Sequence, residues 1–148
     1  MPVTRPLTAC VARIWRTSKE AVCGAGFLAS PGHVMTCAHV VNAALGRELL
    51  ESDPPDAALP VDFPIAGTAR IRGRVVEWRL PHVDAAVLRL EEPCPTDLHV
   101  RELLVMDDPS GRLFQALGFP DGFTQGRNES GMITGAVGGW SARSSPDW

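Results

Sequence analysis

Turn-forming residues recur at short intervals along the chain, so its apolar segments are short. Of its 148 residues, 14 are glycine and 13 are proline. No long segment keeps the 3.6-residue periodicity of an amphipathic helix. Short apolar segments recur instead between turn signals such as Ser30-Pro31-Gly32. This pattern predicts an all-β barrel or sandwich.

Short segments bounded by turn residues mark the expected strands, and some of them alternate. In the first of them Ala12 and Ile14 fall on one face, while Val11, Arg13 and Trp15 fall on the other. Strands are expected over Cys10–Arg16, Ala21–Ala29, His33–Thr36, Ala69–Arg79, Asp84–Leu90, Leu113–Gly118 and Met132–Val137, with one or two helical turns over Ala38–Leu45. Residues 48–64 are acidic and hold prolines at positions 54, 55, 60 and 64, which predicts a long surface loop.

The overall balance of the chain is that of one globular domain. Apolar residues make up 45% and charged residues 21%, which is ordinary for such domains. The net charge of −3 predicts no nucleic-acid partner and no anionic membrane surface. No apolar run reaches about 18 residues, so no transmembrane helix is expected. Because Arg13, Arg16 and Lys19 interrupt any apolar core of a secretory signal, we expect a cytoplasmic protein.

The cysteines at positions 10, 23, 37 and 94 allow two interpretations. An even count is compatible with disulfides in a secreted protein. In a reducing cytosol, buried thiols are the better interpretation. No two cysteines are close enough for a zinc ribbon or a Cys-x-x-Cys redox motif.

The segment from Gly24 to Val41 carries the strongest motif and reads GAGFLASPGHVMTCAHVV. It resembles the catalytic-histidine segment of trypsin-like serine proteases, especially bacterial ones. In that family a Gly-x-Gly-Phe strand turns back into a strand that ends in Thr-Ala-Ala-His or Thr-x-Ala-His. The resemblance implies that His39 is the catalytic base. Small residues before it let the chain turn sharply at the strand end, and Gly24 and Gly26 permit close backbone approach.

A second segment, His82 to Leu90, reads HVDAAVLRL. It resembles the aspartate segment of the same family, Asp-x-Ala-x-Leu-x-Leu. The resemblance implies that Asp84 is the carboxylate that accepts the imidazole Nδ1–H and holds its tautomer. His39 and Asp84 are 45 residues apart, a separation that is usual for the family.

Two later segments, Gln115–Pro120 and Ser130–Val137, resemble the opening strands of the family's second barrel. The resemblance therefore implies a single trypsin-like peptidase domain over residues 1–148. Its fold is expected to be an all-β, trypsin-like double β-barrel. The first barrel is expected to be complete over about residues 10–98 and the second incomplete over about 99–140, with a loose tail over 141–148.

The family's serine segment, Gly-Asp-Ser-Gly-Gly or a near relative, has no counterpart in the sequence. The serines after Asp84 are Ser110, Ser130, Ser141, Ser144 and Ser145, and none lies in a Gly-x-Ser-Gly context. No cysteine follows Cys94, so a late cysteine nucleophile is excluded as well. Loss of a triad member costs several orders of magnitude in rate. We therefore expect the chain itself not to cleave peptides by the family mechanism.

Two functions fit these observations. The first is a trypsin-like serine endopeptidase domain that acts on polypeptides and is truncated before its serine. The alternative is a non-catalytic pseudo-protease barrel that binds a peptide or partner. In either case, the unpaired edges of the second barrel predict self-association, or completion by a fused or partner domain. A small β-barrel of unrelated function is a third, weaker option.

Other readings of the same residues are less favoured. Cys37 and His39 form a conceivable metal pair, but the sequence shows no spacing signal for two further ligands, so no metal is expected. The glycines of residues 24–29 match a degenerate dinucleotide fingerprint, but a turn follows them where a helix is required. We expect no organic cofactor, and we expect His33, His82 and His99 to be surface residues. Asp84 read alone is a turn residue, and His39 a buried structural histidine.

Overall fold

The computed structural model describes residues 7–94, 98, 100, 107–108, 110–119 and 131–136. In chain order its elements are the 3-10 helix η1 (Leu7–Cys10), strands β1 (Val11–Trp15), β2 (Val22–Ser30) and β3 (His33–Thr36), helix α1 (Ala38–Leu45), and strands β4 (Ala58–Asp62), β5 (Ile71–Trp78), β6 (Ala86–Leu90), β7 (Leu113–Gly118) and β8 (Gly131–Ala136).

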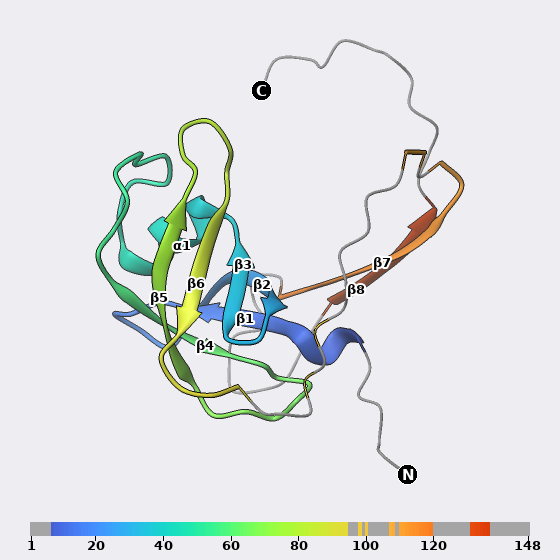
Figure 1. The fold of residues 1–148 in the computed structure, drawn as a ribbon, viewed down its shortest axis with the longest axis horizontal. Helices are drawn as coiled ribbons and strands as arrows, with labels where there is room; N and C mark the ends of the chain where they lie inside the picture. The colour runs from blue at the N-terminus through green and yellow to red at the C-terminus, as the bar shows by residue number, and fades with distance from the viewer. Residues whose placement is uncertain are drawn as a thin grey trace.

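The first six strands close into a barrel (Figure 1). Their order around it is β1-β2-β3-β6-β5-β4, and neighbouring strands are antiparallel. β1 closes the barrel against β4 through the pairs Arg13–Asp62 and Ile14–Val61. Helix α1 packs against β2, β1 and β4. The prediction of an all-β fold with a complete first barrel is confirmed.

The barrel interior is filled by side chains that alternate along the strands. Ala12 and Ile14 of β1 are fully buried, as the polarity pattern predicts. The largest buried side chains come from strands and helix alike: Ile14, Val34, Val41, Leu59, Val61, Phe63 and Leu88. Burial of each such side chain contributes about 1.5–3 kcal/mol. The core therefore belongs to the first barrel as a whole.

The sequence predicts a surface loop over residues 48–64, and this prediction is wrong for its second half. There β4 forms a full member of the barrel. Leu59 and Val61 are fully buried at the spacing of two that a strand requires. Pro60 lies outside the short ladder that joins β4 to β1, so its missing N–H removes no bond from that ladder. The prolines of this segment therefore predict a loop, whereas the alternating apolar residues Leu59 and Val61 form a strand.

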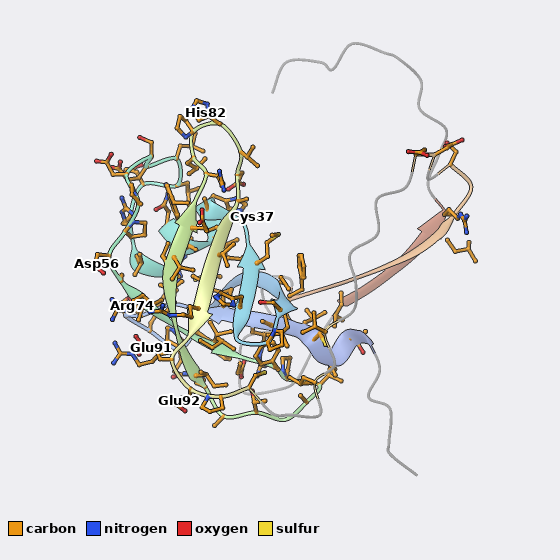
Figure 2. All side chains as sticks on the ribbon, viewed as in Figure 1. Cys37, Asp56, Arg74, His82, Glu91 and Glu92 are labelled. Carbon is orange, nitrogen blue, oxygen red and sulfur yellow. The ribbon has the colours of Figure 1, made fainter. Side chains whose placement is uncertain are left out.

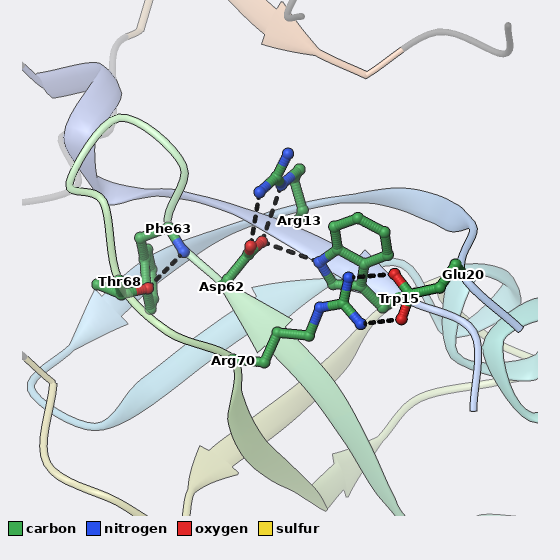
Figure 3. Close-up of polar contacts among 7 residues, drawn as sticks. All are labelled: Arg13, Trp15, Glu20, Asp62, Phe63, Thr68 and Arg70. Carbon is green, nitrogen blue, oxygen red and sulfur yellow. Dashed lines mark hydrogen bonds and ion pairs between the residues drawn. The ribbon is translucent and has the colours of Figure 1, made fainter. Parts of the chain in front are cut away.

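A polar network covers the seam between β1 and β4 (Figure 3). Asp62 is only 5% exposed and accepts two hydrogen bonds from Arg13, at 2.9 and 2.6 Å, and one from the Trp15 indole N–H at 2.9 Å. The Arg70 guanidinium lies 3.7 Å from the centroid of the Trp15 ring and pairs with Glu20 through both of its carboxylate oxygens. Trp15 is therefore buried, although the alternation places it on the face of β1 opposite to Ala12 and Ile14.

The described part of the second barrel is a two-stranded antiparallel sheet of β7 and β8, beside the first barrel (Figure 1). Its register runs from Leu113 opposite Ala136 to Gly118 opposite Gly131. Both strands match the predicted ones to within a residue. The residues between β6 and β7 lie partly outside the described residues, and the predicted tail over 141–148 lies wholly outside them.

Two further features bear on the sequence predictions. All four cysteines are thiols, and no disulfide joins any two of them. Among the described residues, no helix has both the length and the apolar character needed to cross a membrane.

Candidate active site

His39 is placed by the direct passage from β3 into α1. β3 ends at Thr36, Cys37 is the N-cap, and His39 is the second residue of the helix. The Thr36 hydroxyl donates a 2.8 Å hydrogen bond to the carbonyl of Ala25 and so ties the end of β3 to β2. The backbone of Cys37 is extended (φ −79°, ψ 144°), which gives the sharp change of direction. The imidazole is thereby held at one end of the barrel, and 44% of its side-chain surface is exposed.

Two glycines of β2 make room for this passage. A Cβ atom on Gly24 would lie 2.7 Å from a methyl group of Val40, so the glycine lets α1 seat directly on β2. A Cβ atom on Gly26 would lie 2.7 Å from the carbonyl oxygen of Met35. Both contacts are shorter than a real Cβ tolerates. The close approach expected of these glycines is therefore what the strand and helix require.

The pairing of β3 with β6 brings Asp84 to the same place. In that ladder Thr36 lies opposite Ala86. Continuation of the antiparallel register past the strand ends sets Ala38 against Asp84. The loop that carries Asp84 closes on itself, because the Arg79 N–H donates to the Ala85 carbonyl at 3.0 Å. A separation of 45 residues in sequence thus becomes contact in space.

His39 and Asp84 form a two-point contact. The His39 backbone N–H donates to Asp84 Oδ1 at 2.9 Å, and the Nδ1 atom lies 2.5 Å from Oδ2. An ionised carboxylate only accepts hydrogen bonds, so Nδ1 carries the proton. In the neutral ring, Nε2 is then left with a lone pair that faces away from Asp84. Among the described residues, the ring of His39 is hydrogen-bonded to Asp84 alone.

The surroundings keep Asp84 ionised. Burial acts to raise the pKa of Asp84, but hydrogen bonds from the backbone and ring of His39 and from the backbone of Ala38 outweigh it, so the pKa falls below its ordinary value. Burial, and then the charge of Asp84, raise the pKa of the neighbouring Cys37 thiol. Cys37 is therefore a protonated thiol at neutral pH and a poor nucleophile.

The remaining histidines lie elsewhere in the structure. His33 is half-buried on β3, where its Nδ1 is 3.0 Å from the Ser30 hydroxyl. His82 is exposed at the tip of the loop between β5 and β6 (Figure 2). His99 lies outside the described residues.

The rejected serines add no nucleophile to the described part of the site. Ser110 is exposed, and its backbone N–H donates to Asp108. The structure does not describe Ser130, Ser141, Ser144 or Ser145.

Two contributors to the site were not identified from the sequence. One is the Thr36 hydroxyl, which anchors the strand end. The other is the backbone N–H of Ala38, which helps lower the pKa of Asp84. A threonine at a strand end is common in any sheet, and a backbone donor leaves no trace in residue identity. The contribution of the Ala38 N–H becomes apparent only from the register of β3 against β6.

Comparisons with known proteins agree with this geometry. The family model described as a trypsin-like peptidase domain matches residues 24–148. A solved structure of neuropsin, described as a serine protease expressed in the limbic system of mouse brain, is similar with a TM-score of 0.56 at 11% sequence identity. The similarity covers 88% of this chain and 61% of the neuropsin chain. A comparison with curated proteins found no match. With a closed first barrel and a family match over most of its length, the chain belongs to the trypsin-like peptidase domain family.

Proposed function

We propose that the chain supplies two parts of the catalytic site of a serine endopeptidase that acts on polypeptides: the general base and the carboxylate that orients it. His39 is the general base in this proposal and Asp84 its orienting carboxylate. The observation that carries it is the two-point contact between them, with Nδ1 at 2.5 Å from Oδ2. This contact fixes the tautomer that leaves Nε2 free to take a proton from a hydroxyl.

The roles follow from what each group does to the proton. An attacking serine hydroxyl gives its proton to Nε2 of His39, and the ring becomes an imidazolium. Asp84, already ionised, stabilises that cation through the Nδ1–H bond and returns to its resting state when the proton passes to the leaving amine. The exposure of the pair, 44% for His39 and 43% for Asp84, leaves Nε2 accessible to a substrate.

The nucleophile of this reaction is not among the 148 residues, which contain no Gly-x-Ser-Gly segment. We propose that the chain is the N-terminal part of a longer endopeptidase and is inactive as it stands. The backbone N–H groups of an oxyanion hole surround that serine, and each such donor is worth about 10²–10³-fold in rate. Nucleophile, oxyanion hole and specificity pocket would then come together from the missing segment.

The experiment is to read all three frames downstream of the Trp148 codon and to express any extended protein. The expected result is a Gly-x-Ser-Gly segment and an extended protein that a fluorophosphonate probe labels. Labelling should be lost in His39→Ala and kept in His82→Ala, the matched change of an exposed histidine on a neighbouring loop. If no frame encodes such a segment, the endopeptidase proposal is wrong.

The absent serine segment is also the observation that favours the second candidate, a pseudo-protease barrel that binds a peptide or partner without cleaving it. In that case the intact His39–Asp84 contact would be structural. For either function, we propose a cytoplasmic location, a reducing compartment in which thiols such as those of Cys23 and Cys37 persist. Fractionation of the producing cells tests the location directly.

A further inference from the structure

Cys37, His39 and Asp84 come together at the end of the barrel as a set of three different metal ligands. Their ligand atoms, the thiol sulfur, a ring nitrogen and a carboxylate oxygen, all lie within 4.8 Å of one another. The sequence shows only the Cys37–His39 pair. The β3–β6 register adds Asp84 as the third ligand.

We propose that these three side chains bind a zinc ion, and that the bound ion switches off the His39–Asp84 pair. Sulfur, imidazole and carboxylate are the ligands that zinc takes in proteins, and three protein ligands leave a fourth position for water. The switching part of this proposal rests on the proposed function, whereas the binding part does not.

The distances suit a tetrahedral ion. Zinc–ligand bonds of about 2.0–2.3 Å place neighbouring ligand atoms roughly 3.4–3.6 Å apart. The ligand atoms all lie within 4.8 Å of one another, so they need to approach by roughly 1.2–1.4 Å at most. Rotation of a half-buried cysteine and an exposed carboxylate supplies such a movement. Where Nδ1 is the ligand, its 2.5 Å contact with Oδ2 of Asp84 must open at the same time, because ligand atoms from different residues on one zinc ion lie more than about 3 Å apart.

The exposure of the ligands and the charge around Asp84 both favour zinc binding at this site. His39 and Asp84 are each more than two-fifths exposed, so a hydrated ion can reach them. Among the described residues, no arginine or lysine forms an ion pair with Asp84. Figure 2 shows Cys37 below the loop between β5 and β6, with His82 at the outer tip of that loop. Binding releases the thiol proton of Cys37 to solvent, as at other cysteine sites.

Either ring nitrogen gives the same outcome. An ion on Nδ1 moves the ring proton to Nε2, so the orienting hydrogen bond to Asp84 and the free lone pair are both lost. An ion on Nε2 occupies the lone pair that the general base needs. In both cases the pair can no longer take a proton from a hydroxyl, and zinc acts as a reversible inhibitor of the base.

Zinc binding is tested on the full chain without a histidine tag, by competition against a chromophoric chelator. One zinc per chain is expected, and Cys37→Ala should weaken binding at least about a hundredfold, since even outer-shell changes cost 10–100-fold. Cys37 makes no side-chain capping bond, so the variant should keep the fold, which circular dichroism checks. Cys23→Ala and His82→Ala are the matched controls and should bind within about threefold of the parent.

Cobalt substitution identifies the sulfur ligand. The parent and Cys23→Ala should show a thiolate-to-cobalt charge-transfer band, and Cys37→Ala should not. Unchanged zinc affinity in a folded Cys37→Ala, or its loss in His82→Ala, would overturn the proposed ligand set.

A proton resonance separates this inference from the proposed function. The proton between Nδ1 of His39 and Asp84 should give a strongly downfield signal in the zinc-free protein that changes or disappears with one equivalent of zinc. A signal that zinc leaves untouched overturns the switch and leaves the proposed function standing. A zinc-free protein without the signal counts against the proposed function and the switch, while Cys37-dependent zinc binding would still support the site.

Discussion

Replacement of Asp62 should cost more stability than any other single carboxylate change in the first barrel. The side chain is 7% exposed, its Arg13 partner is 13% exposed, and it also accepts the Trp15 indole N–H. Removal of the carboxylate leaves a nearly buried guanidinium and an indole donor without their acceptor. Breaking such a pair costs about 3–5 kcal/mol, a large part of the roughly 5–15 kcal/mol that holds a typical domain together.

Asp62→Asn is the variant in which we propose to measure the loss of unfolding free energy. The amide keeps one acceptor oxygen, so the expected loss falls to about 1–3 kcal/mol of unfolding free energy. The matched control is Asp56→Asn, because Asp56 also pairs with an arginine but is 97% exposed. Its pair should be worth less than about 1 kcal/mol. Urea unfolding followed by far-ultraviolet circular dichroism gives both values.

If Asp62→Asn is no more destabilising than Asp56→Asn, burial does not make the Asp62 pair more stabilising than an exposed one. A double-mutant cycle with Arg13→Met sharpens the result. Arg13→Met removes the cation but leaves Asp62 its bond to Trp15. If the pair is coupled through the network of Figure 3, the double variant should lose less stability than the sum of the two single variants. Strict additivity would show that the two residues stabilise the barrel independently.

Three further predictions follow from the site and its supports. Gly24→Ala should lower the unfolding free energy by about 1–3 kcal/mol, because the new methyl group overlaps Val40, and Val40→Ala should restore part of the loss. Asn42 is fully buried and donates to two carbonyls of the following loop, so Asn42→Ala should cost about 1–3 kcal/mol in the same assay. Since folding lowers the pKa of Asp84, its stabilisation is present above the ordinary pKa of about 3.9 and is lost as the pH falls through the folded value. The stability difference between the parent and Asp84→Asn should therefore shrink in acid, and a difference that grows there would contradict the assignment.

The strands that alternation predicts are the ones whose burial alternates. β1 shows this in Ala12 and Ile14, and β6 shows it in Ala86, Leu88 and Leu90. The sequence does not predict β4, because a proline lies between Leu59 and Val61 and proline ordinarily excludes a central strand. The short ladder that pairs β4 with β1 is a tertiary contact, and the local sequence pattern cannot predict it. The burial of Trp15 on the face opposite to Ala12 and Ile14 has the same cause, because its cover comes from the distant Arg70.

The site was predictable to a different degree from the fold. His39 and Asp84 were found through motifs whose meaning comes from the resemblance, since a spacing of 45 residues does not by itself imply contact. The structure supplies the physical reason in the antiparallel register of β3 and β6. The same register brings Cys37 within reach of Asp84, which the sequence did not suggest. Motifs thus identified the residues, and strand pairing determined which of them meet.

The His39–Asp84 contact is built entirely from the first barrel, and this separates family membership from activity. β3, α1 and the loop before β6 place both residues, and the closed barrel holds these elements without any contribution from β7 or β8. A chain that contains the barrel therefore forms the contact whether or not a serine ever joins it. An intact contact is good evidence of membership of the trypsin-like peptidase domain family and weak evidence of proteolysis. Only a nucleophile, or a ligand such as zinc that uses the same atoms, can show what the contact now does.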